Sequence, residues 1–379
     1  MIDNFVDNLN RRRANFIAMT GDVILDVPDP DACLDGIAAI LQAADVAIGH
    51  LEVPHTDRGV EMRGDVPAPA AKPSAIAVLR RAGFDAMSLA GNHIADQGEI
   101  GIRDTIDLLA QNDLRFTGAG IDEQSARKPA LIECKGRTVA LLSYNCVGPE
   151  MAWATHERAG CAWLRMKTAN GGPVSPTADL VAVADDVRAV LREDIAAARA
   201  QSDLVIVALH KGIVHTPAKL AAYERPVTHA AIDAGADVVV GHHAHILKGI
   251  EIYCGKPVFH GLGNGCVVTN ALSPGQGHPE RDAWVRRRKE LFGFEPDPAY
   301  TLAPFHPEAV NAMIACLIWH EDGSIEPGIV PVHVEAPGLP VLAGSDRAHE
   351  ITAYVERITG AAGLPAIHFD RDGPVRVLR

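Results

Sequence analysis

The sequence has no long apolar run and few cysteines. No stretch reaches about 18 uninterrupted apolar residues, so we expect no transmembrane helix. Residues 1–16 lack the apolar region of a signal peptide. The seven cysteines are scattered and form no CxxC pair, which argues against a disulfide scaffold and against a cysteine-rich zinc module. We therefore expect a soluble, cytoplasmic protein with no membrane contact.

Positive charge is scarce as well. The chain has 35 Lys and Arg against 48 Asp and Glu, a net charge of −13. This balance argues against nucleic acid as a partner, because a nucleic-acid surface needs clustered Lys and Arg. A small anionic substrate stays possible, since a bound metal can reverse the local field. With 47% apolar and 22% charged residues in 379, the chain has ample material for a globular core.

Short apolar runs alternate with helical patterns along the chain. Strands are predicted at 16–19, 45–48, 86–89, 138–144, 204–209 and 238–240, and helices at 32–44, 76–82, 99–111, 179–201 and 223–234. A polar turn is expected at 20–22, and a hairpin with an Asp-Gly turn at 312–334. This alternation is typical of the α/β class. It suggests a core over 1–264, an excursion over 265–310, and a C-terminal hairpin and tail over 311–379.

Residues that commonly bind metals follow several of these predicted strands. They are Asp22, Glu52, Asn92, His93, His210, His242, His243 and His245. Ligands of open α/β sheets gather at the carboxyl ends of strands. Carboxylate, amide oxygen and imidazole together suit divalent ions such as Mn, Fe, Zn or Ni. Two such ions about 4 Å apart can clamp the attacking and leaving oxygens of a displacement.

Each of these residues alone has an ordinary structural explanation. An Asp after a strand is usually a helix cap, and a single His is usually a core or surface residue. Three histidines within residues 242–245 have no packing reason to stand together. Their shared position after a strand therefore predicts a metal site with one or two divalent ions.

Longer motifs resemble a known family. Residues 90–109, AGNHIADQGEIGIRDTIDLL, are similar to the N-N-H-x-x-D segment of the CapA family, which is associated with poly-γ-glutamate capsule synthesis. Residues 208–217 and 229–264 resemble two further blocks of that family, and GDVIL at 21–25 and HLE at 50–52 resemble two short motifs. The family resembles calcineurin-like metallophosphoesterases. This implies a four-layer α-β-β-α sandwich of two mixed sheets with a two-metal site.

The resemblance also implies roles for single residues. Asp22 would bind the first metal, Glu52 would bridge both, and Asn92 would supply an amide oxygen. His93 would be the general acid, oriented by Asp96. His210, His245 and either His242 or His243 would complete the ligand set. The D-x-H form of many phosphoesterases is absent after Asp22, so one ligand of the first metal is missing or replaced.

Four positions depart from the family motifs by carrying a basic side chain or histidine. They are His50, Lys211, Lys248 and His260. One interpretation is drift on a solvated rim; the other is a pocket that binds a small anionic substrate through a carboxylate or phosphate. Under a third, Lys211 merely pairs with a buried carboxylate.

The excursion carries a cluster of basic residues. Arg281, Arg286, Arg287, Arg288 and His306 fall within 273–308. This charge run is either a solvated face, or a lid or oligomer contact that brings Arg and His over the metals. A homo-oligomer is therefore one expectation.

The first functional hypothesis is a metal-dependent, phosphoesterase-like hydrolase acting on a small anionic substrate. The second is a non-catalytic or accessory component of poly-γ-glutamate polymer synthesis. The third is a metal-dependent amidohydrolase or lyase of a small metabolite. The motif positions Asn92, His93, Asp96 and His210 favour the enzyme, because a binding module has no need of a general acid.

Overall fold

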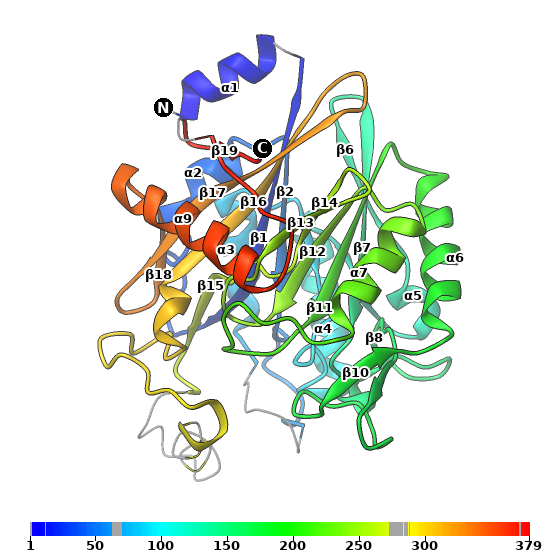
Figure 1. The fold of residues 1–379 in the computed structure, drawn as a ribbon. Helices are drawn as coiled ribbons and strands as arrows, with labels where there is room; N and C mark the ends of the chain where they lie inside the picture. The colour runs from blue at the N-terminus through cyan, green and yellow to red at the C-terminus, as the bar shows by residue number, and fades with distance from the viewer. Residues whose placement is uncertain are drawn as a thin grey trace.

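Two mixed β-sheets lie face to face in the computed structural model, which describes residues 2–11, 13–62, 70–272, 283, 287, 289–370 and 373–379 (Figure 1). The larger sheet has the order β18-β17-β16-β1-β2-β3-β4, with β15 beside β1 and β19 beside β17. The smaller sheet has the order β13-β14-β12-β11-β7-β6. None of the described helices is long and apolar enough to cross a membrane.

The strands of the larger sheet are β1 (Asn15–Asp26), β2 (Val46–Leu51), β3 (Ala86–Ser88), β4 (Arg115–Thr117), β15 (Asn264–Thr269), β16 (Asn311–Trp319), β17 (Ile325–Glu335), β18 (Leu339–Leu342) and β19 (Arg376–Val377). Those of the smaller sheet are β6 (Ala130–Cys134), β7 (Arg137–Asn145), β11 (Leu204–Lys211), β12 (Val238–His243), β13 (Ile250–Tyr253) and β14 (Lys256–Phe259). Two short pairs lie apart from these, β5 (Ala119–Gly120) with β8 (Gly160–Cys161), and β9 (Met166–Thr168) with β10 (Leu180–Val183).

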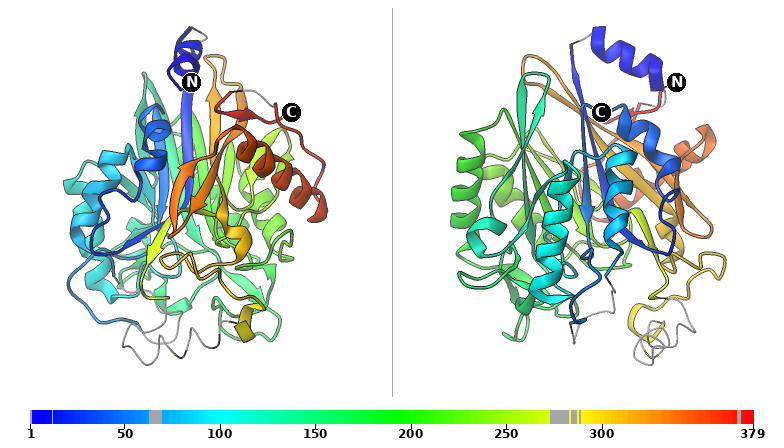
Figure 2. Two further views of the ribbon diagram at one scale, coloured as in Figure 1. Left: turned by 90° about the vertical axis from the view of Figure 1, so that its left-hand side faces the viewer. Right: turned by 180° about the vertical axis from the view of Figure 1, so that it is seen from behind.

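Helices cover the outer face of each sheet. The described helices are α1 (Ile2–Arg11), α2 (Asp35–Gln42), α3 (Ile76–Ala82), α4 (Gly98–Gln111), α5 (Glu123–Ala126), α6 (Val187–Arg199), α7 (Glu224–Asp233) and α9 (Ser345–Ala361), with the 3-10 turns η1 (Pro73–Ala75), η2 (Glu150–Ala152) and η3 (Pro307–Val310). Helices α2, α3 and α4 lie over the larger sheet, and α6 and α7 over the smaller one (Figure 2). Helix α9 contacts β17 and β13, one strand from each sheet. The predicted four-layer architecture is confirmed.

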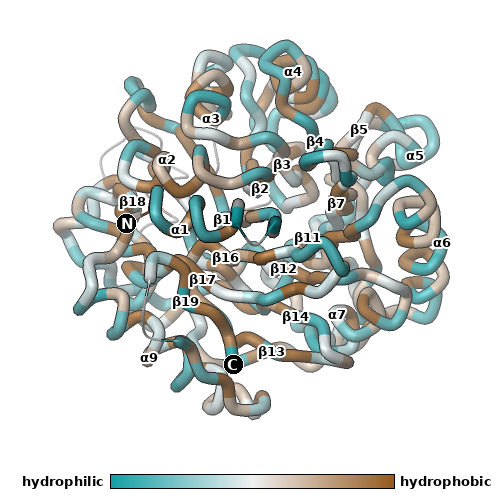
Figure 3. Tube along the Cα trace, turned by 90° about the horizontal axis from the view of Figure 1, so that it is seen from above, coloured by the Kyte–Doolittle hydropathy of each residue, from teal (hydrophilic) through white to brown (hydrophobic). Residues whose placement is uncertain are grey.

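The period-two alternation of the strands explains this layering. In β1, Ile17 and Met19 join the apolar cluster between the sheets, together with Ile206 of β11 and Val240 of β12. Phe16 of β1 belongs instead to the cluster that includes the helices. Both faces of the central strands are therefore apolar, as is typical of strands covered on both sides. Figure 3 shows the same distribution, with hydrophobic segments concentrated on the strands and hydrophilic ones on the periphery.

Two expected element boundaries were wrong. Residues 20–22 continue strand β1 and form no turn there, because β2 and β15 pair with β1 on its two sides at Asp22. Gly21 permits this approach, since a Cβ at that position would lie 1.9 Å from the carbonyl oxygen of Gly263. The helix expected at 179–201 begins only at Val187, because residues 180–183 form β10 and pair antiparallel with β9.

The expected division of the chain also changes at one point. Strand β15 crosses the proposed boundary at residues 264 and 265, so the core continues to Thr269. The hairpin predicted at 312–334 is confirmed as β16 and β17, which pair antiparallel up to Trp319 and Ile325. Arg281, Arg286 and Arg288 of the expected lid lie outside the described residues, so the prediction of a lid or oligomer contact stays a prediction.

Candidate functional site

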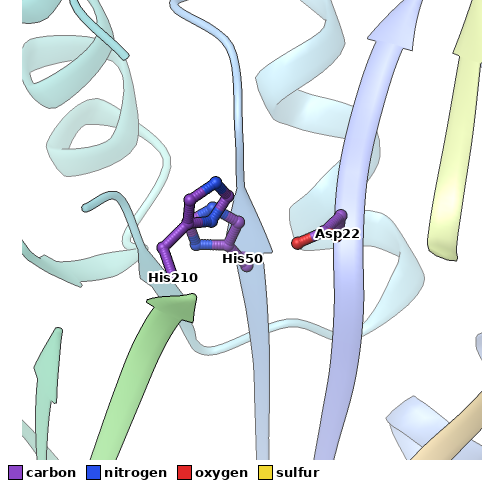
Figure 4. A group of neighbouring side chains, drawn as sticks. All are labelled: Asp22, His50 and His210. Atoms are coloured by element: carbon purple, nitrogen blue, oxygen red, sulfur yellow. The ribbon is translucent and has the colours of Figure 1, made fainter. Parts of the chain in front are cut away.

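Parallel pairing brings the predicted ligands together in register. Asp22 of β1 lies opposite His50 of β2, and His210 of β11 lies opposite His242 of β12. The two sheets face each other through β1 and β12, so these strand ends meet at one place. Figure 4 shows the Asp22 carboxylate directed toward the His50 ring, with His210 at the end of β11 beside it. Asp22, His50 and His210 are all buried.

One group of metal-binding side chains consists of Asp22, His50 and His210. Each offers a ligand atom, and these atoms all lie within 4.8 Å of one another. The His50 ring stacks with that of His242 at 4.6 Å between centroids and lies 4.7 Å from that of His210. His50 Nδ1 is 2.9 Å from the hydroxyl of Ser88, which leaves Nε2 directed at the group.

A second group consists of Asp22, Glu52 and His245, whose ligand atoms also lie within 4.8 Å of one another. His245 Nε2 is 3.3 Å from Glu52 Oε1, and Nδ1 is 3.5 Å from Asp22 Oδ2. The same Nδ1 is 2.9 Å from Oδ1 of Asn264, the first residue of β15. Asp22 therefore belongs to both groups, whereas the resemblance implied that Glu52 would bridge them.

Most imidazoles of the site are neutral, the form in which histidine binds metals. Burial lowers the pKa of His50 to about 4, and that of His242 and His243 to about 3. Burial also acts against the charged form of His245, but Glu52 and Asp22 raise its pKa to about 9. Burial and the charge of Glu52 raise the pKa of Asp22 to about 7. The two carboxylates repel each other, and a bound cation would reduce this repulsion.

His242 and His243 both reach the site. His242 Nδ1 is 3.4 Å from Asp22 Oδ1, while the backbone N–H of His243 donates to Asp22 Oδ2 at 3.2 Å. His243 has φ +84° and His245 has φ +52°, in the left-handed region that non-glycine residues rarely adopt. Such strain concentrates at functional sites. The choice between His242 and His243 as a ligand stays open, because the two metal-binding groups include neither.

His93 and Asp96 form the predicted pair. His93 Nδ1 is 2.7 Å from Asp96 Oδ2, and both side chains are buried. The neighbouring Asn92 places Oδ1 at 2.6 Å from His210 Nε2. Asn92 and His93 line a cavity of about 480 Å³ that also reaches Glu52, His243 and His245. The cavity therefore reaches Glu52 and His245, two residues of the second metal-binding group.

Three of the predicted substrate contacts are placed elsewhere. Lys211 is fully buried, and its Nζ lies 2.7 Å from Glu224 Oε2 and 3.1 Å from the carbonyl oxygen of His260. Lys248, also buried, donates to the carbonyls of Thr216 and Lys219. None of Lys211, Lys248 and His260 lines the cavity. The protein itself supplies the partners of both ammonium groups.

The fourth, His50, was expected to contact substrate and instead lies in the first metal-binding group. The sequence does not reveal the strand register that would have identified His50. A histidine two residues before Glu52 lies at the same sheet edge as Asp22 only if β1 and β2 pair in parallel. Asn264, which contacts His245, was also missed; it ends the family-like block at 229–264.

We expect Lys211→Met to lower stability and leave KM unchanged. It removes one partner of a buried ion pair and leaves the Glu224 carboxylate without its cation, which costs about 3–5 kcal/mol. The melting temperature should fall by roughly 5 °C or more. The double variant Lys211→Met/Glu224→Gln removes the stranded charge and should recover part of the loss. A raised KM at an unchanged melting temperature would restore Lys211 as a substrate contact.

The fold and the strand-end cluster define a layered α/β protein with a buried, histidine-rich site suited to metal ions. The chain belongs to the family described as bacterial capsule synthesis protein PGA_cap, whose model matches residues 16–267. The family resemblance seen in the sequence motifs is thereby confirmed.

Curated relatives carry related names. The chain is 30% identical over 198 residues to "Capsule biosynthesis protein CapA" of Bacillus anthracis, covering 51% of this chain and 43% of that protein. It is 33% identical over 184 residues to "Probable polyglutamine synthesis accessory protein" of Mycobacterium tuberculosis, covering 47% and 43%. The chain thus spans less than half the length of these relatives. Among solved structures, the calcineurin-like phosphoesterase YfkN of Bacillus subtilis aligns with TM-score 0.40 and 13% identity, over 92% of this chain and 97% of that one.

Proposed function

We propose that this protein is a metal-dependent hydrolase with two ion sites that share Asp22. The observation that carries this proposal is the pair of metal-binding groups, one with His50 and His210 and one with Glu52 and His245, of which Glu52 and His245 line the end of a cavity. Its substrate would be a small molecule whose reacting group is an anionic phosphoester or a carboxyl-derived bond.

The donor set fits divalent ions. Within the described part of the chain, His50 Nε2, His210 Nδ1 and His243 Nδ1 are buried and form no hydrogen bond. Buried polar atoms are nearly always satisfied, so unpaired imidazole nitrogens, two of them within a group that includes the Asp22 carboxylate, favour a site for a cation. Nitrogen and carboxylate oxygen ligands suit Mn, Fe, Zn or Ni. When bound, such ions would acidify a water molecule and polarise the bond that is cleaved.

The protein's own residues would manage the proton. Asp96 fixes the His93 ring through Nδ1, so a proton would pass to the leaving group from Nε2. Asn92, beside it, lies against His210 and couples the cavity wall to the first group. Glu52 and His243 line the cavity end and exclude bulk water from one side of the reacting group. Together they support hydrolysis over a role in binding alone.

The second candidate is an accessory, non-catalytic role in poly-γ-glutamate synthesis, since one relative is named a capsule biosynthesis protein and another a probable polyglutamine synthesis accessory protein. It predicts binding of the polymer without turnover. A metal-dependent amidohydrolase or lyase would use the same groups on a different bond. Phosphoester, ester and amide substrates assayed side by side separate these outcomes.

We expect the purified protein to retain one or two divalent ions per chain, measured by elemental analysis after dialysis. Removal with a chelator should abolish hydrolysis of nitrophenyl phosphodiesters, and adding back Mn, Fe, Zn or Ni should restore it. Protein that retains no metal after loading with each ion would contradict the metal site. Retained metal with no turnover on any substrate, but with polymer binding, would favour the accessory role.

A further inference from the structure

The cavity beside the candidate metal groups has walls made largely of apolar side chains. Beyond the end formed by Glu52, Asn92, His93, His243 and His245, its lining includes Ile24, Val53, Val147, Leu180, Ile213, Val214, Leu272, Leu291, Phe292 and Phe305. A volume of about 480 Å³ is within the range of small-molecule sites. The wall therefore offers much more area to apolar groups than a site for a metal-bound phosphate alone would need.

Aromatic rings concentrate at one side of this cavity. The His215 ring lies 5.0 Å from Phe292 and 5.6 Å from Phe305, between centroids. Phe305 in turn stacks on His245 at 4.8 Å. An aromatic wall thus runs directly up to a candidate metal ligand. Such rings favour flat, apolar groups in offset or edge-to-face contact.

The described part of this wall has no cationic side chain. Among the described residues, no Lys or Arg lines the cavity, and the exposed carboxylate of Asp179 stands at its rim. Lys211 and Lys248 are held by Glu224 and by backbone carbonyls. A second anionic group on the substrate would be desolvated against apolar walls without a partner, which is costly.

We infer that the cavity holds an uncharged, apolar group of aryl size, joined to the reacting group that the metals would bind. The inference rests on the proposed function only for the reacting group that the metals would bind. The apolar character of the cavity follows from its lining residues and does not depend on hydrolysis. The sequence-based interpretation was a pocket that binds an anionic substrate through added basic residues; in this inference the part of the substrate beyond the reacting group is neutral.

A matched pair of fluorescent probes tests the wall without turnover. N-phenyl-naphthylamine is uncharged, and anilinonaphthalene sulfonate has the same rings with one negative charge. We expect the uncharged probe to bind at least about tenfold tighter, because the sulfonate would lose its hydration against an apolar wall. Equal or tighter binding of the sulfonate would overturn the inference.

Two variants locate that preference in the cavity. Val214→Lys places an ammonium in the wall, and Thr177→Lys places one at the exposed rim, where folding is not at risk. Either should shift the preference toward the sulfonate by about tenfold, since each adds a partner for the charge. Ile252→Lys, exposed on β13 and outside the cavity, should leave it unchanged. A preference that Val214→Lys and Thr177→Lys both leave intact would place the probe elsewhere and overturn the inference.

A substrate pair separates this inference from the proposed function. Nitrophenyl phenylphosphonate and nitrophenyl phosphate share the nitrophenyl leaving group, and only the first carries a second, apolar ring that stays on the phosphorus. We expect a higher kcat/KM for the phenylphosphonate. If neither is cleaved while the probe preference holds, the proposed function fails and the cavity assignment stands. If the phosphate is cleaved faster and the sulfonate probe binds as well, the cavity assignment fails and the hydrolase stands.

Discussion

Replacing Asp22 with asparagine should remove both metal ions and lower turnover by at least about 10³-fold. Asp22 is the one residue common to the two metal-binding groups found in the described part of the chain, so its carboxylate would contact both ions. Metal ions contribute several kcal/mol of charge stabilisation in such reactions, and each 1.4 kcal/mol is about tenfold in rate. Elemental analysis and initial rates on a nitrophenyl phosphodiester measure the two effects.

Neighbouring variants make this prediction specific. His50→Gln should remove only the ion of the first group, and His245→Gln only that of the second. Asp26→Asn is the matched control, because Asp26 ends the same strand and bonds Thr269 outside both groups. It should retain metal and activity. If Asp22→Asn loses one ion while Glu52→Gln loses both, Glu52 is the bridge, as the family resemblance implied.

The candidate ligands could be predicted from the sequence because strand ends are local features. Asp22, Glu52, His210 and the histidines at 242–245 follow apolar runs, and the topology brings the carboxyl ends of parallel strands to one edge. The α/β class followed in the same way from alternating strands and helices, because both predictions depend on short-range patterns. The four-layer sandwich was an expectation from the family resemblance and not from these patterns.

Roles that depend on register or distant contacts could not be predicted. His50 becomes a candidate ligand only because it pairs with Asp22 across two strands. Lys211 became a structural residue because Glu224, at the start of α7, reaches its ammonium. The charge of Lys211 lowers the Glu224 pKa even though burial acts in the opposite direction. A basic residue at a motif position therefore says little about substrate until its partner is known.

The same limit applies to the cavity. Its wall combines residues from β1, the loop after β11, the segment before β10 and the stretch around Phe292 and Phe305. No single motif joins these segments, so the basic residues at four motif positions suggested a pocket for an anionic group where the structure has an apolar one. At this cavity the sequence supplies one signal, the spacing of His93 and Asp96. The role expected for this pair can be tested by measuring turnover.

His93→Gln should keep the metal content and lower the turnover of an ester with an alkoxide leaving group by about 10²–10⁴-fold, the usual contribution of a general acid. His93 belongs to neither metal-binding group and bonds Asp96 through Nδ1. Asp96→Asn should cause a smaller loss, because it disturbs only the orientation of the ring. His55→Gln is the control, since His55 is equally buried but lies outside the cavity and both groups. Unchanged turnover in His93→Gln would remove His93 from the mechanism.

A comparison of two leaving groups tests whether His93 donates a proton or only forms part of the cavity wall. A nitrophenolate departs without protonation, whereas an alkoxide needs a proton as the bond breaks. The loss in His93→Gln should therefore be large for an alkyl ester and small for the matched nitrophenyl ester, at equal metal content. A residue that only shapes the cavity would lower both rates by the same factor. Comparable losses on the two esters would thus assign His93 to the wall and require a different proton donor.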